Sequence, residues 1–363
     1  MHLNPARPEP MRVAILGAGA IAFASAAMLA RNGHQPVLWS PSGRRTAALA
    51  AGAPLQARGA IDGLFRPAVA ETCAEALDGA DVAYIAVPGY AHRAVIEAIA
   101  PHLRPDQPVI FSSHMSFSML YLLQRRAEHG PAPQVIAWGT TVVTGRQVGQ
   151  AEVLVSNIRA KVDMTVLPAS AAAEAVALCI ALFGDRFVLR DQLAAIALSN
   201  LNPQNHLAIA LCNLTRMEKG EHWLQYANIT GAVGRLMEAL DRERLAVADA
   251  YGVSVRTLHE HFRLSFAAEG ATMAEQAASL SARGADVAAP ATLDSRYVTE
   301  DVPFGLWPTV CLAKAADVSI PLHIAGIQMM STLYGRDFAA ENDILPALAD
   351  LQTTLRSWVG NKG

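Results

Sequence analysis

The sequence has 363 residues, which is long for one hydrophobic core, and two domains of roughly 150 to 200 residues are expected. Charged residues make up only 17% of the chain and its net charge is −3, which excludes a large basic surface for nucleic acid or an anionic membrane and favours small-molecule partners. No C-x-x-C spacing is present, so we predict no metal site and no disulfides, but reduced cytoplasmic thiols at Cys73, Cys179, Cys212 and Cys311.

The first apolar run has two interpretations. Residues 13–30 are uncharged over 18 positions and follow Arg12, as in a signal peptide or a membrane span. The run contains a glycine pattern, however, and the helix stop Asn32-Gly33 follows it directly. We therefore expect a folded strand and helix here and no membrane segment.

Residues 11–17 (MRVAILG) form a buried-strand pattern, and the glycine pattern follows as Gly17-Ala-Gly19-Ala-Ile-Ala22 at the start of a predicted helix. Gly17 permits a tight turn, Gly19 lets the backbone approach a pyrophosphate, and Ala22 lets helix and strand pack. The helix N-terminus then faces the anion. The pattern predicts dinucleotide binding, with an ordinary strand-to-helix turn as the alternative.

The second strand, 36–39, ends at Ser40, where an acidic residue would normally bind the adenosine ribose. The sequence reads Ser40-Pro-Ser42-Gly-Arg44-Arg45 instead, and its hydroxyls and guanidiniums suit a 2′-phosphate. It therefore predicts NADP(H) in preference to NAD(H). The alternative is that the two arginines only solvate the next helix.

Strands alternate with helices along the rest of this half, which predicts a doubly wound parallel sheet. Strands are expected at 82–87, 109–111 and 135–138, helices at 91–98, 116–128 and 171–182, and short β-like runs at 152–155 and 161–167. Pro88 follows one strand where the nicotinamide half of a dinucleotide normally lies. His114 follows the next strand and is predicted either to face substrate or to be a solvated loop histidine.

From residue 191 onward the pattern is almost wholly helical, so we predict a dinucleotide-binding domain over 1–190 and an all-α domain over 191–363. In this second domain the sequence predicts a capping box at Thr272 and Glu275 and a loop over 285–292. Helix stops are expected at Gly252, Gly270, Gly284 and Gly335.

One helix of the second half carries polar residues on an apolar face. Pro203 suits its first turn behind a cap at Asn200 or Asn202, which places His206 near the N-terminus, where the helix field disfavours imidazolium. Asn202, His206 and Asn213 share one face. His206 is interpreted either as a satisfied core histidine or as an acid-base group.

The segment SRYVTEDVPFGL, residues 295–306, supplies a partner for such a histidine. A carboxylate near a neutral imidazole sets its tautomer and stabilises its cation, and Asp301 is the candidate. Arg296 suits a carboxylate substrate. The alternative is that Asp301 only caps a helix beginning near Pro303, with Arg296 and Glu300 as surface charges.

Three stretches together, NPQNH (202–206), DRER (241–244) and RYVTEDVPFG (296–305), resemble the octopine/nopaline (opine) dehydrogenase family over nearly the whole chain. The resemblance implies a Rossmann domain followed by a helical domain, with His206 and Asp301 as the catalytic pair and Arg296 on a substrate carboxylate. It also implies reductive condensation of an amino acid with a 2-oxo acid such as pyruvate, by NADPH or alternatively NADH. Members that use NAD carry an acid at the position of Ser40.

Two other functions are weighed beside this one. A ketopantoate-reductase-like or 2-hydroxyacid dehydrogenase would reduce a 2-oxo acid without an amine, and a dinucleotide-sensing protein would lack turnover. Substrate contacts are predicted at Asn202, His114 and Thr230, whereas Asn213, Trp223 and Tyr226 are further specificity candidates, the last two equally plausible as core. The apolar helix 321–334 is expected to pack internally or to form a homodimer.

Overall fold

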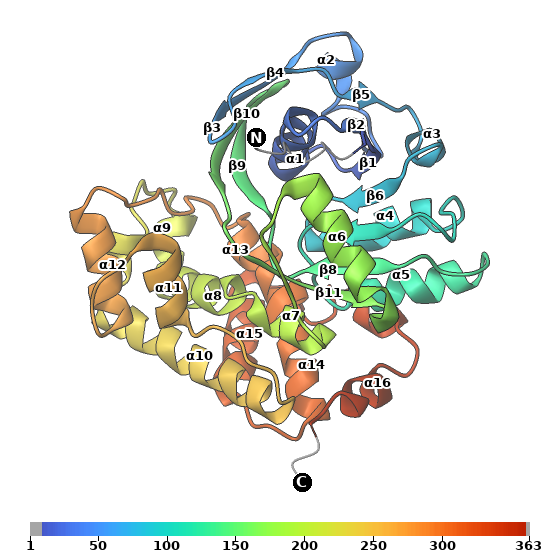
Figure 1. Cartoon of the computed structure of the whole chain (residues 1–363). Helices are drawn as coiled ribbons and strands as arrows, with labels where there is room; N and C mark the ends of the chain where they lie inside the picture. Colours follow the sequence, from blue (N-terminus) through green and yellow to red (C-terminus); the bar gives the residue numbers. More distant parts are fainter. Residues whose placement is uncertain (1–8, 361–363) are drawn as a thin grey trace, which may run out of the picture. The chain divides into compact units, whose positions relative to one another are not determined.

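The computed structural model describes residues 9–360 and divides them into two compact units (Figure 1). The first unit ends at Ile196 and the second begins at Ala197, except that Met115–Phe117 belong to the second. No helix in the described range is long and apolar enough to cross a membrane.

The first unit is built on an eight-stranded sheet in the order β12-β11-β8-β7-β6-β1-β2-β5. β1 (Arg12–Leu16) lies between β2 (Gln35–Trp39) and β6 (Val82–Ile85) and is parallel to both. The carboxyl end of β1 is therefore the point where the strand order reverses, where such sheets bind ligands. The other strands are β5 (Ala68–Val69), β7 (Val109–Phe111), β8 (Val135–Trp138), β11 (Val162–Leu167) and β12 (Phe187–Leu189), and all neighbours are parallel except β11 and β8.

The apolar run near the N-terminus is accounted for by β1 and α1 (Ala20–Arg31). Every residue from Ala22 to Leu29 is buried, because α1 packs against β2 on one side and against β9 (Val143–Gly149) and β10 (Glu152–Ile158) on another (Figure 1). The other helices of this unit are α2 (Ala47–Ala50), α3 (Cys73–Leu77), α4 (His92–Ile99), α5 (Ser118–Ala127) and α6 (Ala172–Phe183).

A second sheet in this unit has the order β4-β3-β10-β9, with β3 at Leu55–Gly59 and β4 at Gly63–Phe65. Sequence patterns predicted only part of β10, because these short strands contain glycines and mix buried with exposed positions. Two predicted boundaries were also wrong. The strand expected over 82–87 ends at Ile85, and the helix expected from residue 116 begins at Ser118, since Ser116 and Phe117 have φ of 51° and 54°.

The second unit is helical, and α7 (Leu193–Ser199) leads into it. Its helices are α8 (Asn202–Cys212), α9 (Leu214–Glu218), α10 (Gly231–Ala250), α11 (Leu258–Phe266), α12 (Met273–Ala282), α13 (Arg296–Thr299), α14 (Trp307–Ala315), α15 (Pro321–Tyr334) and α16 (Leu351–Ser357). Single 3-10 turns lie at Gly89–Ala91, Ala169–Ala171, Tyr226–Asn228 and Leu345–Ala347.

The predicted helix ends of this unit are mostly confirmed. Thr272 and Glu275 form the expected capping box, and Gly335 ends α15 in the left-handed conformation. Gly270 was wrong as a helix stop: α11 already ends at Phe266, and Gly270 precedes α12. Residues 285–292 form a loop, whose Ala288 makes an isolated bridge with Leu224.

Candidate active site

The turn between β1 and α1 is packed too tightly for a side chain at its first glycine. Gly17 has a φ of +143°, and a Cβ there would lie 2.4 Å from the carbonyl oxygen of Ala86. Gly19 is the N-cap of α1, and Ala22 is fully buried. The first N–H groups of α1 have no partner within the helix, so this turn suits an anionic group such as a pyrophosphate.

The turn after β2 supplies polar groups beside the glycine motif. The Oγ of Ser40 is buried and, within the described part of the chain, has no hydrogen-bond partner. Arg44 and Arg45 are both exposed, and Nη1 of Arg45 lies 3.7 Å from the position that a Cβ on Gly19 would occupy. An orphaned hydroxyl and a guanidinium at this place fit a 2′-phosphate, so these residues suit NADP(H).

Pro88 follows β6 and is the N-cap of the 3-10 turn Gly89–Ala91. A buried histidine holds this turn, because His92 Nε2–H donates to the Val87 carbonyl at 3.2 Å while its Nδ1 accepts from Ser118 Oγ at 2.7 Å. Burial lowers the pKa of His92 to about 4, against the opposing effect of the bond to Val87. The ring is therefore neutral at ordinary pH.

His114 is buried, with 2% of its surface exposed, so the solvated-loop interpretation was wrong. Its Nε2 accepts from the backbone N–H of Met119 at 3.4 Å. Burial, and secondarily His92, lower the pKa of His114 to about 3. Any role of this ring is therefore that of an uncharged group.

In the second unit, His206 and Asp301 are in direct contact although 95 positions separate them. The Nδ1–H of His206 donates to Oδ2 of Asp301 at 2.7 Å, and the two side chains are 14% and 10% exposed. Because an ionised carboxylate only accepts, Nδ1 carries the proton and Nε2 is the atom left for proton transfer. Asp301 makes no capping hydrogen bond, so the interpretation as a helix cap alone was wrong.

Asp301 precedes a π-helical turn, Val302–Leu306, which runs directly into α14. This turn lies against the start of α8, since a Cβ on Gly305 would lie 2.4 Å from Cγ of Pro203. Only glycine permits such an approach. The turn therefore brings Asp301 to the helix that carries His206.

The start of α8 differs from the expectation. Leu201, and not Asn202, is the N-cap, although Asn200 Oδ1 accepts from the N–H of Asn202 at 3.1 Å. His206 is the fifth residue of the helix, beyond the first turn, where the helix field is weak. The predicted effect of the helix field on this imidazole stays a prediction.

Arg296 pairs with a neighbour on the same segment. Its Nε forms a short ion pair with Oε2 of Glu300, four residues later. The Arg296 side chain is 68% exposed whereas that of Glu300 is only 4% exposed. Glu300 is thus not a surface charge, and it holds a guanidinium that extends into solvent.

Tyr297, which sequence reasoning did not single out, contacts the histidine directly. Its ring is stacked on His206 with centroids 3.5 Å apart and planes 10° apart. Its hydroxyl donates to Oε1 of Gln225 at 2.5 Å. The only signal in the sequence was the position of Tyr297 between Arg296 and Asp301 in the stretch RYVTEDVPFG.

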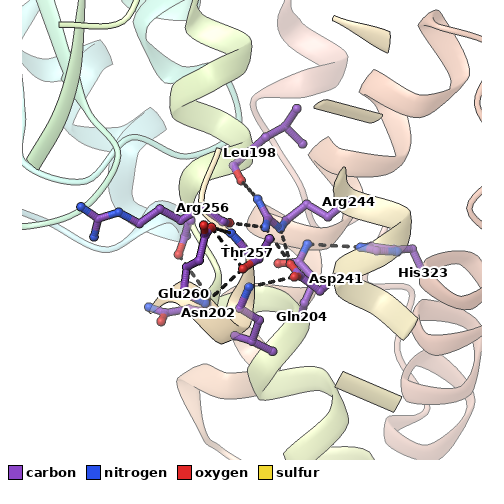
Figure 2. Close-up of polar contacts among 11 residues, drawn as sticks. Leu198, Asn202, Gln204, Asp241, Arg244, Arg256, Thr257, Glu260 and His323 are labelled. Atoms are coloured by element: carbon purple, nitrogen blue, oxygen red, sulfur yellow. Dashed lines mark hydrogen bonds and ion pairs between the residues drawn. The ribbon is translucent and has the colours of Figure 1, made fainter. Parts of the chain in front are cut away.

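The DRER stretch, 241–244, has a structural role. Figure 2 shows Arg244, which is fully buried, between the carbonyl oxygens of Leu198 and Arg256 and the carboxylate of Asp241. The other oxygen of Asp241 accepts from the N–H of Leu258, at the start of α11, at 2.8 Å. The pair thus ties α10 to α11 and to the segment that leads into α8.

A second network also holds α8, and Figure 2 shows its bond between Gln204 and His323. Gln204 Nε2 donates to His323 Nε2 at 3.2 Å, and His323 Nδ1 donates to Oε2 of Glu243 at 2.8 Å. Glu243 also accepts from the backbone N–H groups of Leu322 and His323. Three helices, α8, α10 and α15, are joined by this chain of bonds.

The remaining candidate substrate contacts differ in how far their side chains are exposed to solvent. Asn202 and Thr230 are exposed, and Thr230 is the N-cap of α10 without a side-chain capping bond. Asn213 bonds its own helix, donating to the Ile209 carbonyl at 3.0 Å. Trp223 and Tyr226 are buried, which favours core positions. Among the described residues there is no cluster of three or more side chains suited to a metal ion.

Two family models cover the two halves of the chain. Residues 189–334 match NAD/NADP octopine/nopaline dehydrogenase, alpha-helical domain, and residues 13–164 match ketopantoate reductase PanE/ApbA. An opine dehydrogenase of Arthrobacter sp. (strain 1C) is 30% identical over 352 residues, covering 94% of this chain and 95% of that protein. The chain belongs to the opine dehydrogenase family. It is an NAD(P)-dependent oxidoreductase with a Rossmann-type domain and a helical domain, as the resemblance predicted.

Several solved structures have a similar fold. Octopine dehydrogenase with NADH and L-arginine has a TM-score of 0.79 at 18% identity, covering 96% of this chain and 98% of that one. Yersinopine dehydrogenase with NADP+ bound has a TM-score of 0.71 at 16% identity, covering 96% and 99%. Nicotinamide cofactors of both kinds therefore occur on this fold.

Proposed function

We propose that this protein is an NADPH-dependent opine dehydrogenase, which joins the amine of an amino acid to a 2-oxo acid such as pyruvate and reduces the product to an N-(carboxyalkyl) amino acid. The observation that carries the proposal is the bond between His206 and Asp301 in a chain of this family. Residues 1–190 are assigned to the cofactor and residues 191–363 to the substrates.

The cofactor half of the proposal rests on the two turns that follow β1 and β2. The pyrophosphate would bind at the first turn, which Gly17 and Gly19 shape and where Ala22 lets the helix pack on the strand. The 2′-phosphate would bind at the second turn, to Ser40, Arg44 and Arg45. The nicotinamide would lie beside Pro88. When bound, NADPH supplies the hydride.

The preference for NADPH is tested by substitution at Arg45. We expect Arg45→Ala to lower kcat/KM for NADPH by about tenfold or more, because a charge-assisted contact to the 2′-phosphate is lost. The kcat/KM for NADH should change little. Steady-state kinetics with both cofactors measure this. A wild-type enzyme that uses NADH as efficiently as NADPH, or more efficiently, would contradict the preference.

His206 would transfer protons through Nε2. The carbonyl oxygen of the 2-oxo acid must leave as water when the amine condenses, and an imidazolium can donate the proton that this requires. Asp301 would stabilise the imidazolium and hold its ring by the bond to Nδ1. Arg296 would orient a substrate carboxylate, with Asn202, Thr230 and the neutral His114 as further substrate contacts.

A panel of amino acids and 2-oxo acids with NADPH, followed at the nicotinamide absorbance, tests the reaction. We expect oxidation of NADPH only when an amino acid and a 2-oxo acid are both present. The match of residues 13–164 to ketopantoate reductase makes the reaction without amine the second candidate. Equal rates with and without amino acids would establish that candidate and contradict ours.

We further propose a cytoplasmic homodimer. The four cysteines are free, which supports a reducing compartment. The apolar residues Leu322, Met329 and Leu333 of α15 are 37%, 45% and 54% exposed, which supports association through this helix. Light scattering of the purified protein distinguishes a dimer from a monomer.

A further inference from the structure

His206 is contacted at two places, and the proposed function uses only the bond to Asp301. That bond holds Nδ1 but tolerates a range of angles, so some rotation remains about the terminal torsion of the imidazole, which is broad for histidine. The ring of Tyr297 lies parallel to the imidazole at 3.5 Å, which removes this rotation. The direction of Nε2 is therefore set by Tyr297 and Asp301 together.

Tyr297 is itself held at both ends. Its N–H donates to Oγ of Ser295, the N-cap of α13, at 3.3 Å, and its hydroxyl donates to Gln225 at 2.5 Å. Burial first, and then Tyr226 and Asp301, raise the pKa of Tyr297 to about 12. The phenol consequently stays protonated and remains a donor to Gln225.

Gln225 is held by the loop over 285–292. Only 5% of its surface is exposed, and its N–H donates to the Val287 carbonyl at 2.8 Å. Asp286 accepts from the next two N–H groups, those of Tyr226 and Ala227, at 2.8 Å each. A glutamine in this position is a fixed acceptor and not a mobile surface group.

We propose that Tyr297 is a positioning residue for the proton-transferring histidine, and that Gln225 fixes Tyr297 in turn. The inference rests on the proposed function, because it matters only if His206 transfers a proton. Tyr297 acts through His206: its ring keeps Nδ1 directed at Asp301 and Nε2 directed at the substrate. The loop over 285–292 thereby contributes to catalysis without containing a catalytic residue.

Substitutions that separate the ring from the hydroxyl test the proposal. Tyr297→Leu removes the stack, and we expect kcat to fall by about tenfold, equivalent to about 1.4 kcal/mol, with KM for all substrates within about twofold. Tyr297→Phe keeps the stack and restores most of this loss, leaving kcat about two- to fivefold below wild type. Gln225→Ala removes the same bond and should match Tyr297→Phe, and the double variant should be no slower than either.

Tyr334→Leu is the matched control, because Tyr334 is also half-buried and its hydroxyl also donates to a carbonyl, that of Leu293, at 3.1 Å. We expect its kcat to stay within about twofold of wild type. Equal kcat values for Tyr297→Leu and Tyr334→Leu would overturn the proposal. If Tyr297→Leu does not fold, the double variant decides, because losses that multiply would show that Tyr297 and Gln225 act independently.

The variant His206→Ala distinguishes a failure of the proposed function from a failure of the positioning role of Tyr297. If this variant retains wild-type turnover, the proposed function fails, and the role of Tyr297 fails with it. If it loses turnover while Tyr297→Leu does not, only the inference about Tyr297 fails.

Discussion

The helical unit contains two histidine–carboxylate pairs of nearly equal geometry. His206 donates from Nδ1 to Asp301 at 2.7 Å, and His323 donates from Nδ1 to Glu243 at 2.8 Å. They differ at the other nitrogen, because Nε2 of His323 is bonded to Gln204 and its side chain is 0% exposed, whereas His206 is 14% exposed. A histidine with both nitrogens bonded inside the protein joins helices, and one with a nitrogen left over can transfer a proton.

The sharpest way to break this comparison is to convert each carboxylate to its amide. We expect Asp301→Asn to lower kcat by on the order of a hundredfold or more, as for His206→Ala, with cofactor affinity nearly unchanged. Glu243→Gln should leave kcat within about twofold when assayed well below its melting temperature. Turnover and cofactor titrations measure both, and similar kcat losses in the two variants would show that the pairs do not differ in function.

For stability we expect the opposite order, with Glu243→Gln losing more than Asp301→Asn. Glu243 accepts three hydrogen bonds, from His323 Nδ1 and from two backbone N–H groups, so an amide in its place directs a donor at a donor. We expect Glu243→Gln to lower the free energy of unfolding by about 1–3 kcal/mol, and Asp301→Asn by less. Urea denaturation measures this, and a larger loss for Asp301→Asn would contradict the ranking.

The smallest expected effect is a pH dependence. Burial would raise the pKa of Glu243, but the bonds from His323 and the backbone outweigh it and lower the pKa below its usual value. The stabilisation is therefore present above the unfolded-state pKa of about 4.3 and is lost as pH falls through the lower folded-state pKa. The stability difference between wild type and Glu243→Gln should be constant near neutrality and shrink below about pH 4. A difference that grows on acidification would contradict this sign.

Local patterns predicted the parts of the fold whose causes are local. The turn at Gly17 and the capping box at Thr272 were predicted because each backbone conformation requires particular residues at a fixed spacing in the sequence. The small sheet was missed apart from part of β10, since Gly59 and Gly145 lie in its strands and weaken the alternation that identifies a strand.

The candidate site shows a similar division. Chemical reasoning made Asp301 a candidate partner for His206, and the family resemblance implied the pair. Nothing in the spacing of two residues 95 positions apart fixes their contact. The Arg296–Glu300 pair could have been anticipated from its i, i+4 spacing. Tyr297, Gln225 and His323 were missed because each contact depends on tertiary packing, which no local spacing predicts.

The absence of a side chain at Gly305 limits which parts of the site can change between related enzymes. Because the backbone at that residue lies directly against the ring of Pro203, this close packing sets the spacing of proton donor and carboxylate. Surrounding side chains can therefore change to admit a different amine without altering this spacing. Adding even one methyl group at residue 305 would force the two segments apart and lengthen the bond on which proton transfer depends.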